Sequence, residues 1–316
     1  MRKIFLIILS ISFFVEGCVS INIPRVGPLT EHRIDGTGAD KILIMDISGI
    51  ILDKEEDFMS LRTMPRLTAR IKEELDKASE DSRVMAVVLR VNSPGGTVTT
   101  CDIINHELKK FKQKTGKIVV AELMDVAASG GYYIAAASDR IVAHPTTITG
   151  SIGVVAYNIN ASGLLEKIGI TNETIKSGDK KDIGSPLRPM TDEERKILQG
   201  IIDSLYSRFL DAVAEGRKEI AKEEFKGIAD GRVYTAEQAL KIKLIDRIGY
   251  LDDAIELAKS EAGIKDATIV TYARPGSYRS NIYSAWDMPS IINLVNIDAG
   301  SFMGFPGIRF MYLWMP

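Results

Sequence analysis

The sequence predicts an α/β protein in which parallel strands alternate with helices. Two segments, Val84 to Val91 (VMAVVLRV) and Lys117 to Glu122 (KIVVAE), are nearly continuous apolar runs. Runs of this length are typical of strands that helices cover on both faces. Between them, apolar residues recur at helical spacing from Ile103 to Phe111. Strand, helix and strand in this order predict right-handed parallel crossover units.

The same patterns place further elements on both sides of this unit. Strands are expected at 41–48, 140–143 and 267–272, and helices at 66–80, 129–137, 191–215, 236–242 and 251–262. The longest of these helices begins with a capping box, in which Thr191 is followed three residues later by Glu194. Residues 92–97 (NSPGGT) are expected to form a turn.

One domain over residues 41–273 accounts for this organisation. A linker at 18–40, which contains prolines and glycines, is expected before it. A tail at 274–316 follows, and its apolar end leaves three roles open. It could pack on other subunits, touch a membrane, or lie in the active-site groove as a pseudo-substrate.

The composition is that of a globular protein and excludes some classes of function. The 316 residues are 45% hydrophobic and 26% charged, and their formal net charge is -2. This balance gives no basic footprint for nucleic acid. The only cysteines, Cys18 and Cys101, cannot form a disulfide framework, and no Cys/His spacing suggests a metal site.

The N-terminus has the pattern of an export signal. Arg2 and Lys3 precede an apolar run from Ile4 to Val15, which is shorter than the ~20 residues that span a bilayer. The end of this run, Val15 to Cys18, resembles the lipoprotein box of bacteria, so Cys18 is a candidate for lipidation. Alternatively, residues 1–17 form an uncleaved anchor, or a secretory signal followed by an incidental cysteine. Each alternative places the body of the protein on the far side of the membrane from the cytoplasm.

Two glycine-bearing segments are candidates for chemistry. Asn92 to Gly96 directly follows a buried strand, and its paired glycines allow backbone N–H groups to face a ligand or an oxyanion. Ser129 precedes Gly130 and Gly131 at the start of an expected helix, where N–H groups can stabilise anionic intermediates. In isolation, a tight turn and an ordinary serine helix cap explain these segments better.

A nucleophilic serine also needs a base. No supporting pattern surrounds the three histidines, which are His32, His106 and His144. Lysine can serve instead when burial or neighbouring cations lower its pKa. Lys176, Lys180 and Lys181 lie in one segment, and adjacent side chains of an extended segment face opposite ways. The residues alone do not choose among these lysines, and a solvated basic loop is the alternative interpretation.

Several motifs occur together in the order seen in one family. They are Asn92–Gly96, Asp125–Tyr133, Thr149–Gly153, Lys176–Pro186 and Asp230–Tyr234. Over about residues 41–273 the chain resembles signal peptide peptidase A, of the protease IV group of bacterial Ser-Lys peptidases. The resemblance implies the ClpP/crotonase-like fold, an α/β superhelix of strand-strand-helix units.

The resemblance also implies a role for each matching residue. Ser129 matches the nucleophile, Lys181 the general base, and Ser151 the serine that orients the lysine. Gly96 matches the glycine of the oxyanion hole, and the N–H of Gly130, next to the nucleophile, is expected as a second donor. No metal or organic cofactor is implied.

The implied function is a serine endopeptidase of the bacterial membrane, with its catalytic domain outside the cytoplasm. Its expected substrates are peptides such as cleaved signal peptides, which could add as a strand along the site. Short family members imply a homo-oligomer, such as an octameric ring, in which the lysine of one subunit completes its neighbour's site. A crotonase-like CoA-thioester enzyme and a non-catalytic membrane scaffold are the alternatives. The export signal and the Ser/Lys pair favour the peptidase.

Overall fold

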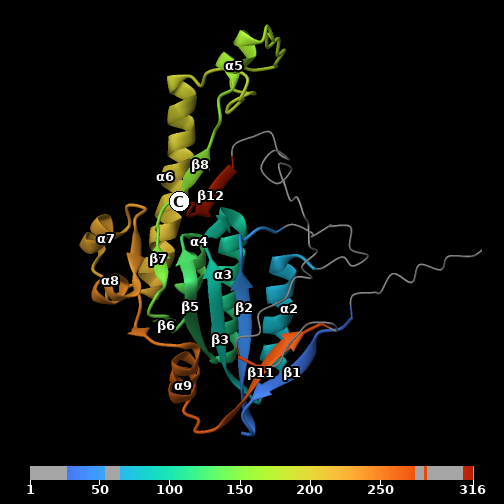
Figure 1. Ribbon diagram of the computed structural model, residues 1–316, viewed down its shortest axis with the longest axis vertical. Helices are drawn as coiled ribbons and strands as arrows, with labels where there is room; N and C mark the ends of the chain where they lie inside the picture. Colours follow the sequence, from blue (N-terminus) through green and yellow to red (C-terminus); the bar gives the residue numbers. More distant parts are fainter. Residues whose placement is uncertain (1–26, 54–64, 275–280, 283–308, 316) are drawn as a thin grey trace, which may run out of the picture.

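The computed structural model describes residues 27–53, 65–274, 281–282 and 309–315 (Figure 1). The export signal and Cys18 lie outside these residues, as does the first part of the expected linker. Within the described ranges, no helix combines the length and the apolar character needed to cross a bilayer.

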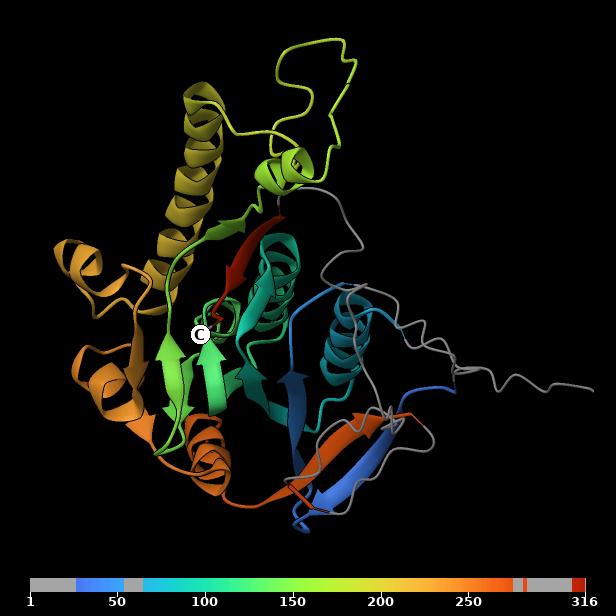
Figure 2. The same cartoon turned by 45° about the horizontal axis from the view of Figure 1, so that its top comes forward.

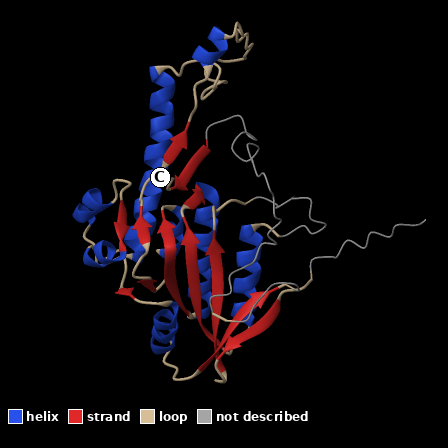
Figure 3. Cartoon of the chain, in the orientation of Figure 1, coloured by secondary structure: helices blue, strands red, loops and turns tan. Residues whose placement is uncertain are grey.

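A nine-stranded, mostly parallel sheet forms the centre of the molecule and confirms the α/β prediction (Figure 3). Its main path runs β1-β11-β2-β3-β5-β6-β10, and β7 and β9 branch from β5. The strands are β1 (Thr30–Asp35), β2 (Asp40–Ser48), β3 (Val84–Ser93), β5 (Ile118–Ala128), β6 (Arg140–Ala143), β7 (Ile148–Gly150), β9 (Val233–Thr235), β10 (Arg247–Ile248) and β11 (Ala267–Ala273).

Helices cover both faces of this sheet. They are α2 (Leu67–Glu80), α3 (Val98–Thr115), α4 (Gly130–Ala135), α5 (Ser162–Lys167), α6 (Asp192–Gly216), α7 (Lys222–Ile228), α8 (Ala236–Lys241) and α9 (Leu251–Glu261). Along β3, Val87 and Leu89 join the large core beneath α2, α3 and α4, whereas Ala86 and Val88 join a smaller core beneath α9. Because alternate side chains of a strand enter opposite cores, the run is apolar at nearly every position.

A second, three-stranded sheet lies at the carboxyl end of the large one. Its order is β4-β12-β8, from β4 (Gly95–Thr97), β12 (Arg309–Leu313) and β8 (Val155–Tyr157). β12 pairs antiparallel with both neighbours. The NSPGGT segment is therefore not only a turn, because its glycines form a strand whose partner comes from the far end of the chain.

An arm, residues 155–201, extends from this small sheet away from the body (Figures 1 and 2). It contains β8, α5, the loop that follows and the first turns of α6. Large apolar side chains are exposed along it: Tyr157, Ile159, Leu164, Ile168, Ile170, Ile175, Leu187, Ile197 and Ile201. Exposed apolar surface of this extent is typical of a surface that another protein or a membrane covers.

The domain begins earlier than the sequence suggests. Residues 30–35, expected in the linker, form β1, which pairs antiparallel with β11 at the edge of the sheet. β1 reads TEHRID and is mostly exposed, so it carries little of the apolar alternation by which strands are found. Backbone pairing with β11, rather than burial, defines this strand.

Candidate active site

Ser129 forms a sharp turn between the end of β5 and the start of α4. Its backbone has φ 51° and ψ -115°, a conformation that is uncommon for residues other than glycine and costs about 1–3 kcal/mol. Two hydrogen bonds fix it: the Ser129 N–H donates to Gly150 O at 2.7 Å, and its carbonyl accepts from Tyr133 N–H at 2.8 Å. A strained serine between strand and helix is typical of a hydrolase nucleophile.

The Ser129 side chain does not act as a helix cap. The residue occupies the N-cap position of α4, yet its side chain makes no capping hydrogen bond. Ser129 is also almost fully buried, with 1% of its surface exposed. The interpretation of Ser129 as an ordinary cap is therefore wrong, and its hydroxyl is not committed to the helix end.

The glycines around Ser129 allow two backbone segments to approach closely. A Cβ atom on Gly130 would lie 2.4 Å from Cys101 Sγ, and one on Gly95 would lie 2.6 Å from the Gly130 nitrogen. Gly95 also has φ 101°, a conformation that favours glycine. The fold thus brings β4, which contains Gly96, against the first residue of α4. The expected oxyanion donors, Gly96 and Gly130, come from these adjoining segments.

Ser151 lies beside Ser129 at the ends of two parallel strands. Ala128 of β5 and Gly150 of β7 are register partners, so the next residues along the two strands are Ser129 and Ser151. Ser151 shares the unusual φ of 51°, is 7% exposed, and donates its N–H to Arg232 O at 2.7 Å. The serine expected to orient the base therefore lies next to the expected nucleophile.

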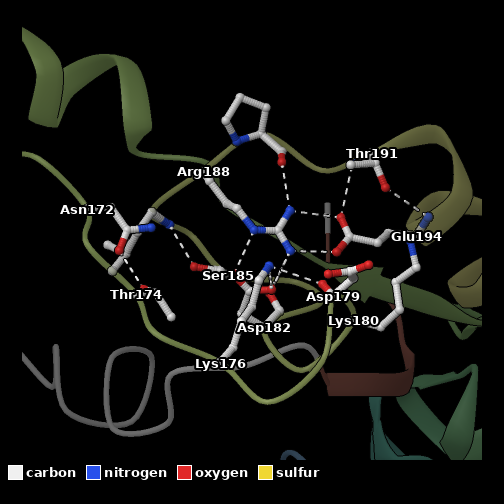
Figure 4. A network of polar contacts seen from close by, with 12 residues as sticks. Asn172, Thr174, Lys176, Asp179, Lys180, Asp182, Ser185, Arg188, Thr191 and Glu194 are labelled. Carbon is white, nitrogen blue, oxygen red and sulfur yellow. Dashed lines mark hydrogen bonds and ion pairs between the residues drawn. The ribbon is translucent and has the colours of Figure 1, made fainter.

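Lys181 is exposed in the loop of the arm. Figure 4 shows the ion pairs around Arg188 that hold this loop. Arg188 connects two acids, with its Nε 2.8 Å from Asp182 and its Nη1 2.9 Å from Glu194. Hydrogen bonding to Arg188 lowers the pKa of Asp182 below its usual range and that of Glu194 to about 2. Both carboxylates therefore stay ionised at neutral pH and hold the loop to the start of α6.

The other two candidate lysines are paired with acids. Lys176 contacts Asp182 at 2.7 Å, and Lys180 contacts Glu193. The hydrogen bond that Lys180 donates to Glu193 raises the pKa of Lys180, which keeps this amine protonated and unsuited to act as a base. Among the ion pairs of the described residues, none uses Lys181. The contacts thus favour Lys181 over its neighbours as the base, a choice that the residues alone left open.

Within one chain, Lys181 lies far from Ser129. The lysine loop is held at the start of α6 through Glu193. The Ser129 helix packs further along α6, where the rings of Tyr133 and Phe209 lie 5.1 Å apart. Glu193 and Phe209 are sixteen positions apart along this α-helix, which corresponds to about 24 Å. The chain therefore brings together Ser129, Ser151, Gly96 and Gly130, but not Lys181.

The C-terminal strand β12 was not predicted from the sequence, although it lies next to the candidate site. β12 lies beside the oxyanion glycines, where Tyr312 is the register partner of Gly96. The segment is apolar and aromatic, but its strand partners lie far away in the sequence. No local pattern therefore identifies its position.

A buried serine on a strained turn, between a strand of a parallel sheet and a helix and beside two glycine-bearing segments, is the arrangement of a serine-type hydrolase. Residues 111–265 match the model of peptidase family S49. The chain is 40% identical to a protein of Enterococcus faecium named "Putative signal peptide peptidase SppA", over 77% of this chain and 70% of that protein.

Two further relatives of the chain are also named as proteases. A protein of Methanocaldococcus jannaschii named as a putative protease is 35% identical over 86% of this chain and 87% of its own length. "Protease 4" of Haemophilus influenzae is 34% identical over 73% of this chain and 36% of its own. The chain belongs to peptidase family S49 and is a serine peptidase. This result favours the peptidase interpretation over a CoA-thioester enzyme or a non-catalytic scaffold.

Proposed function

We propose that the chain is an endopeptidase whose site is shared between subunits, with Ser129 as nucleophile and Lys181 of a neighbouring subunit as base. The observation that carries this proposal is the placement of the two residues. Ser129 is strained and buried with its expected partners, whereas Lys181 lies on an arm that is held at Glu193, about 24 Å along α6 from the Phe209 contact of the Ser129 helix. A second copy of the chain can supply the missing amine.

The chemistry follows from these positions. Neutral Lys181 accepts the proton of the Ser129 hydroxyl, and the serine oxygen attacks the carbonyl of a peptide. The N–H groups of Gly96 and Gly130 stabilise the oxyanion. The Lys181 ammonium then protonates the leaving amine, and water resolves the acyl-enzyme. Lysine serves as a base only when its pKa is lowered, and docking of the arm beside Ser151 supplies the burial that lowers it.

The surface of the arm supports a homo-oligomer. Its exposed apolar side chains flank the lysine loop on both sides, from Ile159 to Ile201. A head-to-tail contact, in which each arm covers the next subunit, repeats until a ring closes. We therefore propose a ring, such as the octamer that the family resemblance implies.

The proposed location is the outer side of a bacterial membrane. The basic and apolar pattern of residues 1–17 supports export, and Cys18 is the candidate for a lipid anchor. Cleaved signal peptides are the proposed substrates, in keeping with the name of the Enterococcus relative. A mass spectrum of the mature N-terminus distinguishes a lipidated Cys18 from an uncleaved anchor.

Mixing two inactive variants tests the shared site. Ser129→Ala and Lys181→Ala, each assembled alone, are expected to lack activity. If each site takes its serine and its lysine from different subunits, co-assembly at equal amounts recovers roughly a quarter of wild-type activity. If both residues come from one chain, the mixture stays inactive, and the proposal is wrong.

Serine-directed fluorophosphonate labelling tests the nucleophile separately. Wild type is expected to label at Ser129, and Ser129→Ala is expected not to label. Equal labelling of both proteins contradicts the peptidase mechanism. Lys180→Ala is the matched control for Lys181→Ala, because it removes the adjacent amine and leaves the proposed base. Loss of activity in Lys180→Ala with full activity in Lys181→Ala reverses the assignment of the base.

A further inference from the structure

Asp182, the residue directly after Lys181, is held by its side chain and by its backbone. Its carboxylate accepts hydrogen bonds from Arg188 Nε at 2.8 Å, from Arg188 Nη2 at 2.6 Å and from Lys176 Nζ at 2.7 Å. Its carbonyl accepts from the Ser185 N–H at 3.0 Å and from Arg188 Nη2 at 3.3 Å. The backbone next to Lys181 is therefore fixed, although none of these contacts uses the lysine side chain.

Arg188 joins this loop to the start of α6 (Figure 4). Its guanidinium donates two hydrogen bonds to Asp182 and two to Glu194, which is only 1% exposed. Glu194 is fixed in turn by the capping box, because it accepts from the Thr191 N–H at 2.9 Å and donates its own N–H to Thr191 Oγ1 at 3.2 Å. A planar guanidinium that binds two carboxylates in this way sets their relative orientation, which a lysine ammonium does not.

The helix that carries Glu194 is also the support of the whole arm. α6 continues from Asp192 to Gly216, and the ring of its Phe209 lies 5.1 Å from that of Tyr133 in the body. A continuous helix keeps its two ends at a set distance. The three residues Asp182, Arg188 and Glu194, called the brace below, therefore attach the Lys181 loop to a rigid support at a defined place.

The position of the Lys181 amine decides whether it can act as a base. A general base must lie about 2.6–3.2 Å from the atom whose proton it accepts. Misplacement by about 1 Å can lower the rate ~100-fold. In the proposed shared site, Lys181 must meet this condition at the Ser129 hydroxyl of another subunit, from an exposed loop. Such a loop needs internal contacts that hold the lysine in one place.

We propose that Arg188, with Asp182 and Glu194, is a positioning residue that fixes how Lys181 enters the site of the neighbouring subunit. This proposal rests on the proposed shared peptidase site and specifies what the subunit that donates the base must contribute. Arg188 touches neither the substrate nor the reacting atoms, so its loss is expected to act on kcat. Both acids of the brace stay ionised at every pH at which a lysine is neutral.

Mixed assemblies test which subunit needs the brace. A chain with Ser129→Ala still donates Lys181, and a chain with Lys181→Ala still donates Ser129. Arg188→Ala in the lysine-donating chain is expected to lower the recovered activity about tenfold or more. The same substitution in the serine-donating chain is expected to leave the recovered activity unchanged. An equal loss in the two arrangements, or no loss in either, overturns the proposal.

Asp182→Asn is the second variant, because Arg188→Ala leaves the buried Glu194 without its cation. Asparagine keeps the shape of the side chain, and Arg188 keeps its pair with Glu194. The same one-sided loss is expected, of smaller size. Arg188→Lys is expected to recover part of the activity that Arg188→Ala loses, since it restores the charge without the paired geometry. Full activity of Asp182→Asn in the lysine-donating chain contradicts the brace.

Kinetics of the Arg188→Ala oligomer distinguish positioning from a structural role. The expected result is a lower kcat with an unchanged KM and an unchanged size of the assembly. The acid limb of the kcat profile is expected to move to higher pH, because a poorly docked lysine is less buried and its pKa is lowered less. A changed assembly size, or a higher KM with the same kcat, assigns Arg188 a structural role and overturns the proposal.

Arg140→Ala is the matched control. Its pair with Glu261 is also formed by a partly exposed arginine, at 2.8 Å, but it joins β6 to α9, outside the arm. This variant is expected to behave like wild type in both chains. Failure of the brace is distinguishable from failure of the shared site. If Ser129→Ala and Lys181→Ala together recover no activity, both proposals are wrong. If they recover activity that Arg188→Ala does not change, only the brace is wrong.

Discussion

The Ser129 N–H donates to the carbonyl of Gly150 at 2.7 Å, and this hydrogen bond connects the turn of the proposed nucleophile to the turn of Ser151. Both serines have φ 51°. Two strained residues can lie side by side here because each directly follows the end of a strand. The pairing of these two parallel strands fixes both backbones. The geometry of the site therefore depends on the β5–β7 ladder more than on α4.

Replacement of Ser129 by glycine is expected to separate strain from catalysis. Ser129→Gly removes the hydroxyl and the cost of the positive φ, so activity is lost while the free energy of unfolding rises by up to about 1 kcal/mol. Ser129→Ala also loses activity but keeps the strain. Urea denaturation of the two inactive variants measures the difference, and an equal or lower stability of Ser129→Gly contradicts a strained turn.

Replacement of Gly130 by alanine is expected to disrupt the proposed oxyanion hole. The new methyl group would lie 2.4 Å from Cys101 Sγ of α3 and 2.9 Å from Tyr312 O of β12, so α4 must move away from these two elements. A shift of this kind can lower kcat by ~100-fold. Gly227→Ala, in α7 and outside the arm, is the control, because a methyl group there meets no atom within 4 Å. Full activity in Gly130→Ala shows that the N–H of residue 130 is not required at its present place.

The Tyr312 side chain is expected to hold the tail in the site. Tyr312→Ala removes its ring contacts and its hydrogen bond to Leu205. Loss of these interactions weakens the hold of β12 beside Gly96. Added peptides then compete with the tail more easily, and their cleavage is expected to rise several-fold. Met315→Ala is the control, since its side chain is exposed beyond the strand. Peptide cleavage that is the same in wild type and Tyr312→Ala shows that the tail does not compete with substrates.

Glu122 is expected to make stability depend on pH. It is fully buried in β5, and neither carboxylate oxygen has a hydrogen-bond partner among the described residues. Burial, with a smaller contribution from Asp253, raises its pKa to about 9. The folded state therefore holds a proton that the unfolded state releases near pH 4.5. Between these two pKa values, stability falls as pH rises, by at most ~1.4 kcal/mol per pH unit.

Glu122→Gln tests this dependence directly. Glutamine has nearly the same shape as the protonated carboxyl group and does not titrate. The variant is expected to be more stable than wild type at pH 8 and to lose most of the slope between pH 5 and pH 8. Denaturant midpoints across that range provide the measurement. Parallel stability curves for the two proteins contradict a buried, protonated Glu122.

Much of the fold follows from local patterns in the sequence. The continuous apolar run of β3 reflects two cores, and the capping box at Thr191 marks the start of α6. Gly116 ends α3 in the left-handed conformation. These features depend on residues close together in the chain, which is why the sequence locates them.

The features that the sequence missed depend on distant partners. β1 is defined by its pairing with β11, and β4 by its pairing with β12. For the same reason, local patterns could not place the tail. The site shows a similar division. Ser129 and Gly130 were found from their motif, whereas the contacts that distinguish Lys181 from Lys180 arise from the ion pair with Glu193.

The distance between Lys181 and Ser129 has a consequence for safety in the cell. A protease that carries its own base can cleave other proteins of the cell as soon as it folds. With the proposed arrangement, a newly made chain has no proteolytic activity at low copy number, because catalysis requires an encounter with a second chain. Activity then rises steeply with local crowding, so anchoring to a two-dimensional surface would itself be a trigger.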